Sequence, residues 1–180
     1  MDKLTVNNDI FFAQTIEFLK AGKQVTIPVH GYSMMPTIRN LRDSVILEGV
    51  EGGTPEGVAR RKVRTGDIVL FRFHERYLLH RIIQIRGDVA EIQGDGVAGG
   101  REHCRLDEIY AKATTILRNG TRPINPYSTC SALKLSLWNM FSPVRRYLLA
   151  ILRRLPYYKD PARPTVSGPS HNSPAQRRGE

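Results

Sequence analysis

Cysteine is scarce in this chain of 180 residues, and so are apolar runs long enough to cross a membrane. The two cysteines, Cys104 and Cys130, are too few and too far apart to predict a disulfide framework or a zinc site. Residues 1–8 are polar, and Glu17 and Lys20 interrupt the apolar run that follows, which is not the pattern of a secretory signal peptide. The sequence also has no metal-ligand cluster, phosphate-binding glycine loop or haem signature, so we expect no cofactor and no metal.

Acidic residues are scarce in the C-terminal third. Residues 118–180 hold 11 Lys and Arg against two acidic residues, whereas residues 1–117 hold 16 against 15. The net charge of +10 therefore resides almost wholly in the C-terminal region, while the body is nearly neutral. This distribution indicates a basic appendage on a neutral domain, so we do not expect nucleic acid as a partner.

Short apolar segments separated by turn residues make up most of the body. A helix is expected over residues 7–23, because Asn8 or Asp9 can cap its start and Gly22 its end. The segment 51–64 is rich in glycine and basic residues and is expected to be a mobile loop. We expect strands at 24–29, 43–50, 66–73 and 77–85, a strand and then a turn at 89–96, and a last strand or sheet edge at 109–117. The pattern predicts a mainly β, antiparallel, partly closed fold with a short N-terminal helix.

The C-terminal region differs from the body. We expect a linker over 119–130, a basic amphipathic helical segment over 131–158 and a disordered tail over 159–180. Pro143 and the arginines around it break the apolar run of the helical segment, which therefore does not read as a membrane span. Two interpretations stay open for it: a helix lying on an anionic membrane surface, or a helix packed on the body with its basic face in solvent.

A stiff turn at residues 31–38, GYSMMPTI, carries a candidate nucleophile. Gly31 permits unusual backbone angles, and Pro36 restricts the residue before it. The hydroxyl of Ser33 needs a base within hydrogen-bond reach to become a nucleophile. Of the five histidines, His80 is the one that lies within an apolar strand, where its ring could be held in a fixed pose; a simple core histidine is the alternative.

The order of four segments resembles that of type I signal peptidases and their LexA-like relatives. The segments are GYSMMPTI at 31–38, GDIVLFRF at 66–73, LLHRII at 78–83 and IQGDG at 92–96. In this family the basic residue that precedes an arginine on the third segment is lysine in the bacterial leader peptidases and histidine in the endoplasmic-reticulum-type and archaeal branch. Here that residue is His80, so the chain is similar to the second, Ser-His-Asp branch. The resemblance covers residues 20–117 and implies a signal-peptidase-like catalytic β domain at 24–118, preceded by the N-terminal helix at 1–23.

This resemblance implies a serine endopeptidase that works through an acyl-enzyme. Ser33 would be the nucleophile, His80 the general base, and Asp95 the residue that orients the imidazole. Asp88 is the rival acid, although its place in the tight turn at 86–88 suits a structural role. Asp67 matches the aspartate of the family's Gly-Asp strand, and we expect it to stabilise a turn and not to take part in catalysis.

The same resemblance indicates how a substrate could be held. The backbone N–H of Ser33 is the expected oxyanion donor. Some bacterial relatives carry a second donor, a serine, at the position of Gly31, so here a second donor must come from elsewhere. Met34 and Met35 are candidates for lining an apolar substrate groove; the alternative is that they simply pack.

We therefore expect cleavage of precursor or leader peptides, with a precursor peptide or protein as substrate. The expected location is the cytoplasm or the periphery of the cytoplasmic membrane, with 131–158 contacting an anionic membrane surface. An alternative of another class is a non-processing LexA-like regulatory or scaffold module, docked through its basic tail. A DNA-binding repressor is disfavoured because only about 20 residues precede the body, too few for a helix-turn-helix domain.

Overall fold

The computed structural model describes residues 8–50, 62–74, 76–97, 99–140, 147 and 149–151. Most of the expected loop at 51–64 and the whole expected tail at 159–180 lie outside these residues. The described elements are, in chain order, α1 (Asn8–Lys20), β1 (Val25–Pro28), β2 (Ser44–Gly49), β3 (Ile68–Phe73), β4 (Arg76–Arg86), β5 (Val89–Gln93), β6 (Glu102–Arg105), a short 3-10 helix (Leu106–Glu108), β7 (Ile109–Arg118), β8 (Arg122–Ile124) and α2 (Thr129–Met140).

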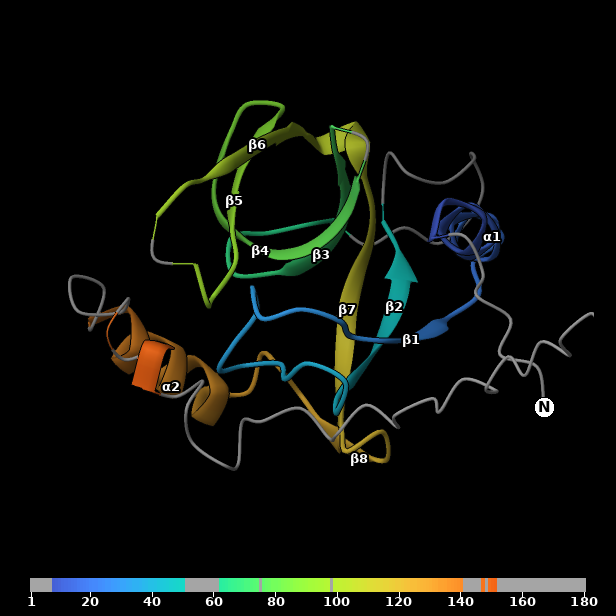
Figure 1. Ribbon diagram of the computed structural model, residues 1–180. Helices are drawn as coiled ribbons and strands as arrows, with labels where there is room; N and C mark the ends of the chain where they lie inside the picture. Colours follow the sequence, from blue (N-terminus) through green and yellow to red (C-terminus); the bar gives the residue numbers. More distant parts are fainter. Residues whose placement is uncertain are drawn as a thin grey trace, which may run out of the picture.

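The strands form one antiparallel sheet in the order β1-β2-β7-β3-β4-β5-β6, and β8 also pairs with β7. Figure 1 shows that β3 to β6 curl round on the left of the upper half of β7, while β1 and β2 extend the sheet toward α1 on the right. The expectation of a mainly β, antiparallel fold with few short helices is confirmed. β7 is a central strand, because it pairs with β2 and β3, so the edge position left open for 109–117 does not occur.

Two strands were not predicted from the sequence. β6 is a four-residue strand that pairs with β5 alone. β8 lies inside the segment 119–130, for which we expected a linker, and it pairs with the end of β7. Part of this expected linker is therefore built into the sheet.

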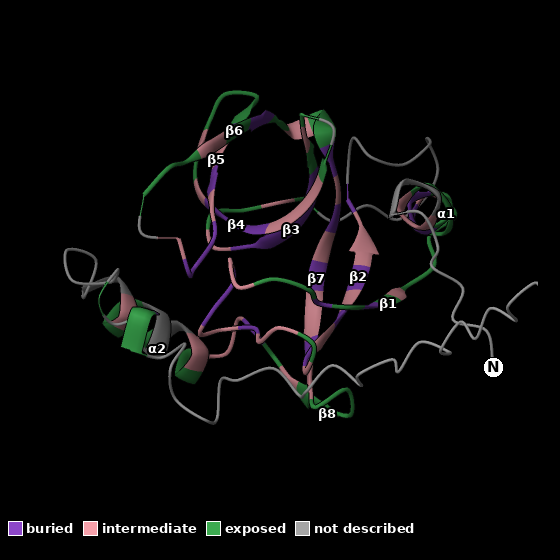
Figure 2. Cartoon of the chain, viewed as in Figure 1, coloured by how far each residue is buried: buried purple, intermediate pink, exposed green. Residues whose placement is uncertain are grey.

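Two hydrophobic cores lie on opposite faces of β3, which explains why this strand is apolar without alternation. Ile68 and Leu70 belong to the helix-side core, which fills the space between the sheet and α1. Val69 and Phe71 belong to the inner core, enclosed by the curled strands β3 to β6. The burial colours of Figure 2 follow this division, with β3 purple along most of its length.

The C-terminal region is tied to the body before α2 begins. Tyr127 donates its hydroxyl proton to the carbonyl oxygen of Ala113 at 2.6 Å and accepts from the N–H of Ile68 at 3.2 Å. α2 starts two residues later and ends at Met140, and residues 147 and 149–151 are also helical. The remainder of the expected helical segment at 131–158 lies outside the described residues. Among the described residues, no helix is both long enough and apolar enough to span a membrane.

Candidate functional site

The turn at residues 31–38, called here the Ser33 turn, leaves Ser33 half-buried. Gly31 has φ +100° and donates its N–H to Asn40 Oδ1 at 2.7 Å. That N–H is therefore engaged within the protein. Met34 and Met35 are only 2% and 1% exposed. Of the two alternatives for these methionines, this burial agrees with the second, in which both pack in the interior.

The Ser33 turn rests on a second turn, residues 94–96, that follows β5. The N–H of Gly96 donates to the carbonyl oxygen of Ser33 at 2.7 Å. A Cβ atom on Gly94 would overlap with the same carbonyl oxygen, and one on Gly96 would overlap with the carbonyl oxygen of Tyr32. Both glycines are therefore required for the close approach of the two turns, which fixes the backbone of the candidate nucleophile.

The sheet register relates this contact to His80. Gln93 lies opposite Arg81 in the pairing of β5 with β4, so Gly94, the next residue, leaves the sheet near the level of His80. Gly94 is the residue against which the Ser33 carbonyl packs. The structure thus brings the Ser33 turn to the end of β5 that lies beside His80. Among the described residues the Ser33 hydroxyl makes no hydrogen bond.

His80 is buried in the middle of β4, with 4% of its surface exposed. It lies opposite Val69 in the register, and its ring centroid is 6.2 Å from that of Phe71, so it faces the inner core. Its Nδ1 atom lies 3.4 Å from Oε2 of Glu102 on β6. This separation is longer than an ordinary hydrogen bond, but neither atom has another partner in the described part of the chain.

Burial lowers the pKa of His80 below its ordinary value of 6.5, and the negative charge of Glu102 opposes this shift without reversing it. The imidazole is therefore neutral at pH 7. A proton on Nδ1 can point at Glu102, which leaves Nε2, on the other side of the ring, as the basic nitrogen. A neutral histidine beside a carboxylate is the state that a general base requires.

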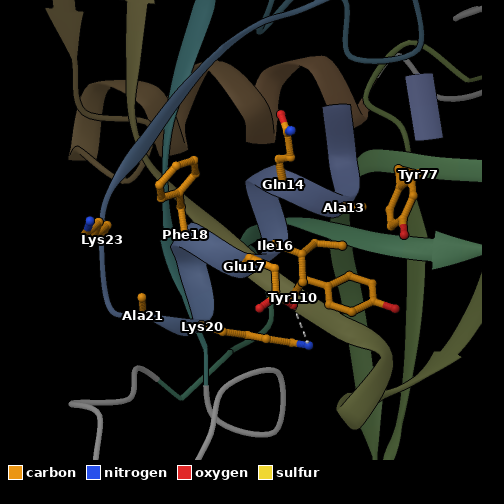
Figure 3. A pocket seen from close by; sticks show the side chains of 10 residues that line it. All are labelled: Ala13, Gln14, Ile16, Glu17, Phe18, Lys20, Ala21, Lys23, Tyr77 and Tyr110. Carbon is orange, nitrogen blue, oxygen red and sulfur yellow. Dashed lines mark hydrogen bonds and ion pairs between the residues drawn. The ribbon is translucent and has the colours of Figure 1, made fainter. Parts of the chain in front are cut away.

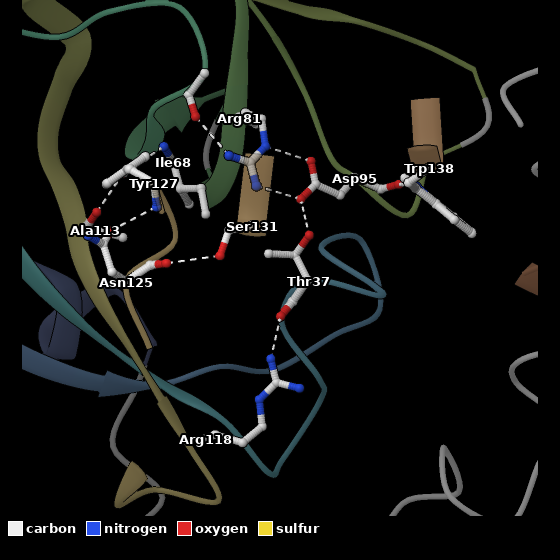
Figure 4. A network of polar contacts seen from close by, with 11 residues as sticks. Thr37, Ile68, Arg81, Asp95, Ala113, Arg118, Asn125, Tyr127, Ser131 and Trp138 are labelled. Atoms are coloured by element: carbon white, nitrogen blue, oxygen red, sulfur yellow. Dashed lines mark hydrogen bonds and ion pairs between the residues drawn. The ribbon is translucent and has the colours of Figure 1, made fainter. Parts of the chain in front are cut away.

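Asp95 has a different set of partners from the one expected. Its carboxylate accepts two hydrogen bonds from the buried guanidinium of Arg81, at 2.9 and 2.8 Å, and one from the Thr37 hydroxyl at 2.6 Å. Its backbone carbonyl accepts from Trp138 Nε1 at 2.7 Å (Figure 4). The carboxylate beside His80 Nδ1 is thus that of Glu102, whereas Asp95 fastens the 94–96 turn to β4, the Ser33 turn and α2.

The rival acid Asp88 is also placed elsewhere. Its side chain is 68% exposed and lies 3.4 Å from a guanidinium nitrogen of Arg105. Asp67 accepts the backbone N–H of Arg64 at 2.8 Å and lies 2.7 Å from Lys112 Nζ. This contact within the turn at 64–67 agrees with the turn-stabilising role expected for Asp67.

Glu102 is the residue that the sequence reasoning missed. It lies on β6, two residues before Cys104, so the two side chains point to the same face of the strand. Cys104 is buried in the inner core, and burial raises the pKa of its thiol to about 12, which keeps the sulfur protonated. In the sequence of residues 102–105, the single apolar residue Cys104 between polar neighbours was the available signal for a strand. A segment this short cannot be distinguished from a loop.

No group of three or more His, Cys, Asp and Glu side chains that could hold a metal ion occurs among the residues that the structure describes. A pocket of about 800 Å³ lies elsewhere, between α1 and the side chains of Tyr77 and Tyr110 (Figure 3). It contains none of the residues proposed from the sequence. Lys20 and Glu17 form an ion pair of 3.3 Å at its edge.

No protein-family model matches this chain, and no curated protein matches its sequence. The resemblance to signal peptidases therefore depends on the four ordered motifs of the sequence.

Proposed function

We propose that the protein is a serine endopeptidase of the signal-peptidase type, with a signal-peptidase/LexA-like β fold, that cleaves precursor or leader peptides. The observation that carries the proposal is the buried His80–Glu102 pair at the level where the Ser33 turn meets the end of β5. The candidate site therefore combines a neutral base, a carboxylate that can orient it, and the hydroxyl of a half-buried serine whose backbone is held by two glycines.

The proposed reaction begins with attack of Ser33 Oγ on the carbonyl carbon of the scissile peptide bond. His80 Nε2 takes the Ser33 proton, and Glu102 stabilises the resulting imidazolium through Nδ1. The oxyanion is met by the backbone N–H of Ser33. His80 then passes the proton to the departing amine, so the C–N bond breaks and the acyl-enzyme remains. His80 then takes a proton from a water molecule, whose oxygen attacks the ester carbonyl carbon. As the bond to Ser33 Oγ breaks and the new peptide carboxylate leaves, His80 returns that proton to Ser33.

In this proposal Asp95 is a positioning residue and not a member of the proton relay. Its bonds to Arg81 and Thr37 join β4 to both turns, so they hold Ser33 at the level of His80. This assignment replaces the expected Ser33, His80 and Asp95 set with Ser33, His80 and Glu102.

Comparison of cellular protein N-termini by mass spectrometry tests the proposal. Cells expressing the wild-type chain are compared with cells expressing Ser33→Ala, and Ser136→Ala, which removes an exposed hydroxyl from α2, serves as the matched control. We expect a set of N-termini present with wild type and Ser136→Ala and absent with Ser33→Ala. Identical N-termini in all three, with each protein folded and abundant, would overturn the proposal and favour the non-processing scaffold.

We also propose that the region 131–158 contacts an anionic membrane surface. The described part of α2 supports this, because Leu133 and Leu137, one helical turn apart, are 71% and 53% exposed. The basic residues of the same region supply the charge that anionic lipid headgroups attract.

A further inference from the structure

A second pocket, of about 540 Å³, lies between the Ser33 turn, the ends of β7 and β8, and α2. Arg81 lines this pocket. Because successive residues of a strand point to opposite faces, the pocket lies on the other side of β4 from the His80 side chain. Half of the residues that line it are apolar, namely Pro36, Ile116, Ile124, Pro126 and Trp138.

Three arginines, Arg81, Arg118 and Arg122, give this pocket a positive character. Arg81 is satisfied, since its three guanidinium nitrogens bind Asp95 and the carbonyl oxygen of Gly66. Figure 4 shows Arg118 below this network, donating to the carbonyl oxygen of Thr37 at 3.1 Å.

The two arginines at the rim of the pocket, Arg118 and Arg122, differ in the carboxylates that lie near them. Arg118 Nε lies 3.5 Å from Asp43 Oδ2, but Asp43 also accepts two closer hydrogen bonds from Arg42, at 2.9 and 3.1 Å. Among the described contacts, the Asp43 carboxylate thus lies closer to Arg42 than to Arg118. Arg122 is exposed on β8 and forms no ion pair with any residue that the structure describes. The exposed guanidinium of Arg122 is thus the group at this end of the pocket that can receive a carboxylate.

We propose that this pocket binds a carboxylate carried on an apolar or aromatic peptide residue. The guanidinium of Arg122 can receive a carboxylate in the two-pronged geometry that arginine favours, with Arg118 adding attraction from the rim. The proline, isoleucine and tryptophan side chains provide a surface for the apolar part of the ligand. The inference goes beyond the proposed peptidase reaction and does not require Ser33 to be a nucleophile.

Trp138 offers a direct readout of the pocket, because it is the only tryptophan of the chain. Its indole N–H is bound to the carbonyl oxygen of Asp95, and its ring lines the pocket. A ligand beside the ring changes the environment of this single N–H. The pocket is also connected to the Ser33 turn, because Asp95, which binds Trp138, is followed by Gly96, whose N–H binds the carbonyl oxygen of Ser33.

The experiment is a titration of the full, ¹⁵N-labelled chain while the indole N–H signal of Trp138 is followed by NMR. The probes are N-acetyl-phenylalanine, its amide as the uncharged control, and the peptide N-acetyl-Phe-Glu-amide. The first carries a terminal carboxylate and the third an internal one, so they distinguish a peptide C-terminus from an acidic side chain. We expect saturable shifts with at least one carboxylate probe, at concentrations up to about 10 mM, and none with the amide.

Two variants with the same change of charge separate the pocket from general electrostatics. Arg122→Gln should weaken carboxylate binding about two- to fivefold, as expected for one exposed guanidinium. Arg105→Gln, whose side chain is 61% exposed on β6, should leave the affinity unchanged. Equal shifts with acid and amide, no shift with either carboxylate, or equal weakening by the two variants would overturn the proposal. Because binding is measured without catalysis, an inactive Ser33 would not affect the result.

Discussion

His80 is buried beside a carboxylate, and this surrounding determines the pH range in which it can act. Burial lowers its pKa below 6.5, whereas the charge of Glu102 raises it. The neutral base therefore persists below pH 6.5. In the unfolded chain histidine takes a proton near pH ~6.5, so the stability that neutral His80 contributes is lost as the pH falls from that value through the lower folded pKa.

We predict that the acid limb of the pH profile of kcat/KM has its midpoint below pH ~6.5. In Glu102→Gln the midpoint should move lower still, because the carboxylate that favours the imidazolium is gone. The measurement is the rate of peptide cleavage from pH ~4 to ~9, which covers about two pH units on each side of the ordinary histidine pKa. A midpoint that rises in the variant would contradict the arrangement described here.

We predict that removing the charge of Glu102 mainly lowers kcat, whereas removing the charge of Asp95 mainly lowers the free energy of unfolding. Glu102→Gln should lower kcat about 10²- to 10⁴-fold, the range of a general-base contribution, with little change in stability. Asp95→Asn should cost about 3 kcal/mol of unfolding free energy, because the buried guanidinium of Arg81 loses its counter-charge.

Urea unfolding and steady-state cleavage of both purified variants provide this comparison. If Asp95→Asn kept its stability and lost its activity while Glu102→Gln remained active, Asp95 would regain the role first expected for it.

Among the elements, the 94–96 turn connects the sheet to the candidate nucleophile. It has two glycines because carbonyl groups of the Ser33 turn occupy the space of any Cβ there. In β3 the packing also determines the residue types. This strand lies between two hydrophobic cores, so it needs apolar residues on both faces.

We predict that Gly94→Ala lowers the unfolding free energy by about 2 kcal/mol and the cleavage rate with it, because the added methyl group pushes the Ser33 carbonyl away. Gly99→Ala is the matched control, since nothing lies within 4 Å of a Cβ at that position. Thermal unfolding and activity are measured on both. Equal, small effects would show that the two turns are not in close contact.

On the scale of the whole molecule, the nearly neutral body and the basic C-terminal region are joined by Tyr127 and Trp138. Trp138 contacts the 94–96 turn, while Leu133 and Leu137 on the same helix are exposed. α2 therefore contacts the 94–96 turn through Trp138 and leaves the side chains of Leu133 and Leu137 exposed.

We predict that the full chain sediments with vesicles that contain an anionic phospholipid and not with vesicles of phosphatidylcholine alone. The double variant Leu133→Ser, Leu137→Ser should bind at least about tenfold more weakly, because two exposed leucines no longer enter the interface. Val89→Ser, which removes an exposed apolar side chain from β5, should bind as wild type does. Binding that survives the double variant would leave charge alone as its cause.

Local patterns in the sequence were sufficient for α1 and for the long strands, whereas the choice of Ser33 and His80 needed the resemblance of four ordered segments to a known family. Caps, alternation and glycine turns act between neighbours in the chain, so they can be recognised without knowledge of the fold. The antiparallel fold class followed from the spacing of the strands, whereas β6 and β8 were missed because strands of four and three residues carry too little pattern.

The partners of the charged residues were decided by the tertiary structure alone. Asp95 and Glu102 are both acidic residues after β5, and nothing local shows that one will meet Arg81 and the other His80. The pairing of β5 with β4 and β6 makes that choice, because register determines which side chains share a face. The sequence by itself thus determined the candidate nucleophile and base, and strand pairing over long distances in the chain selected the carboxylate that lies beside the base.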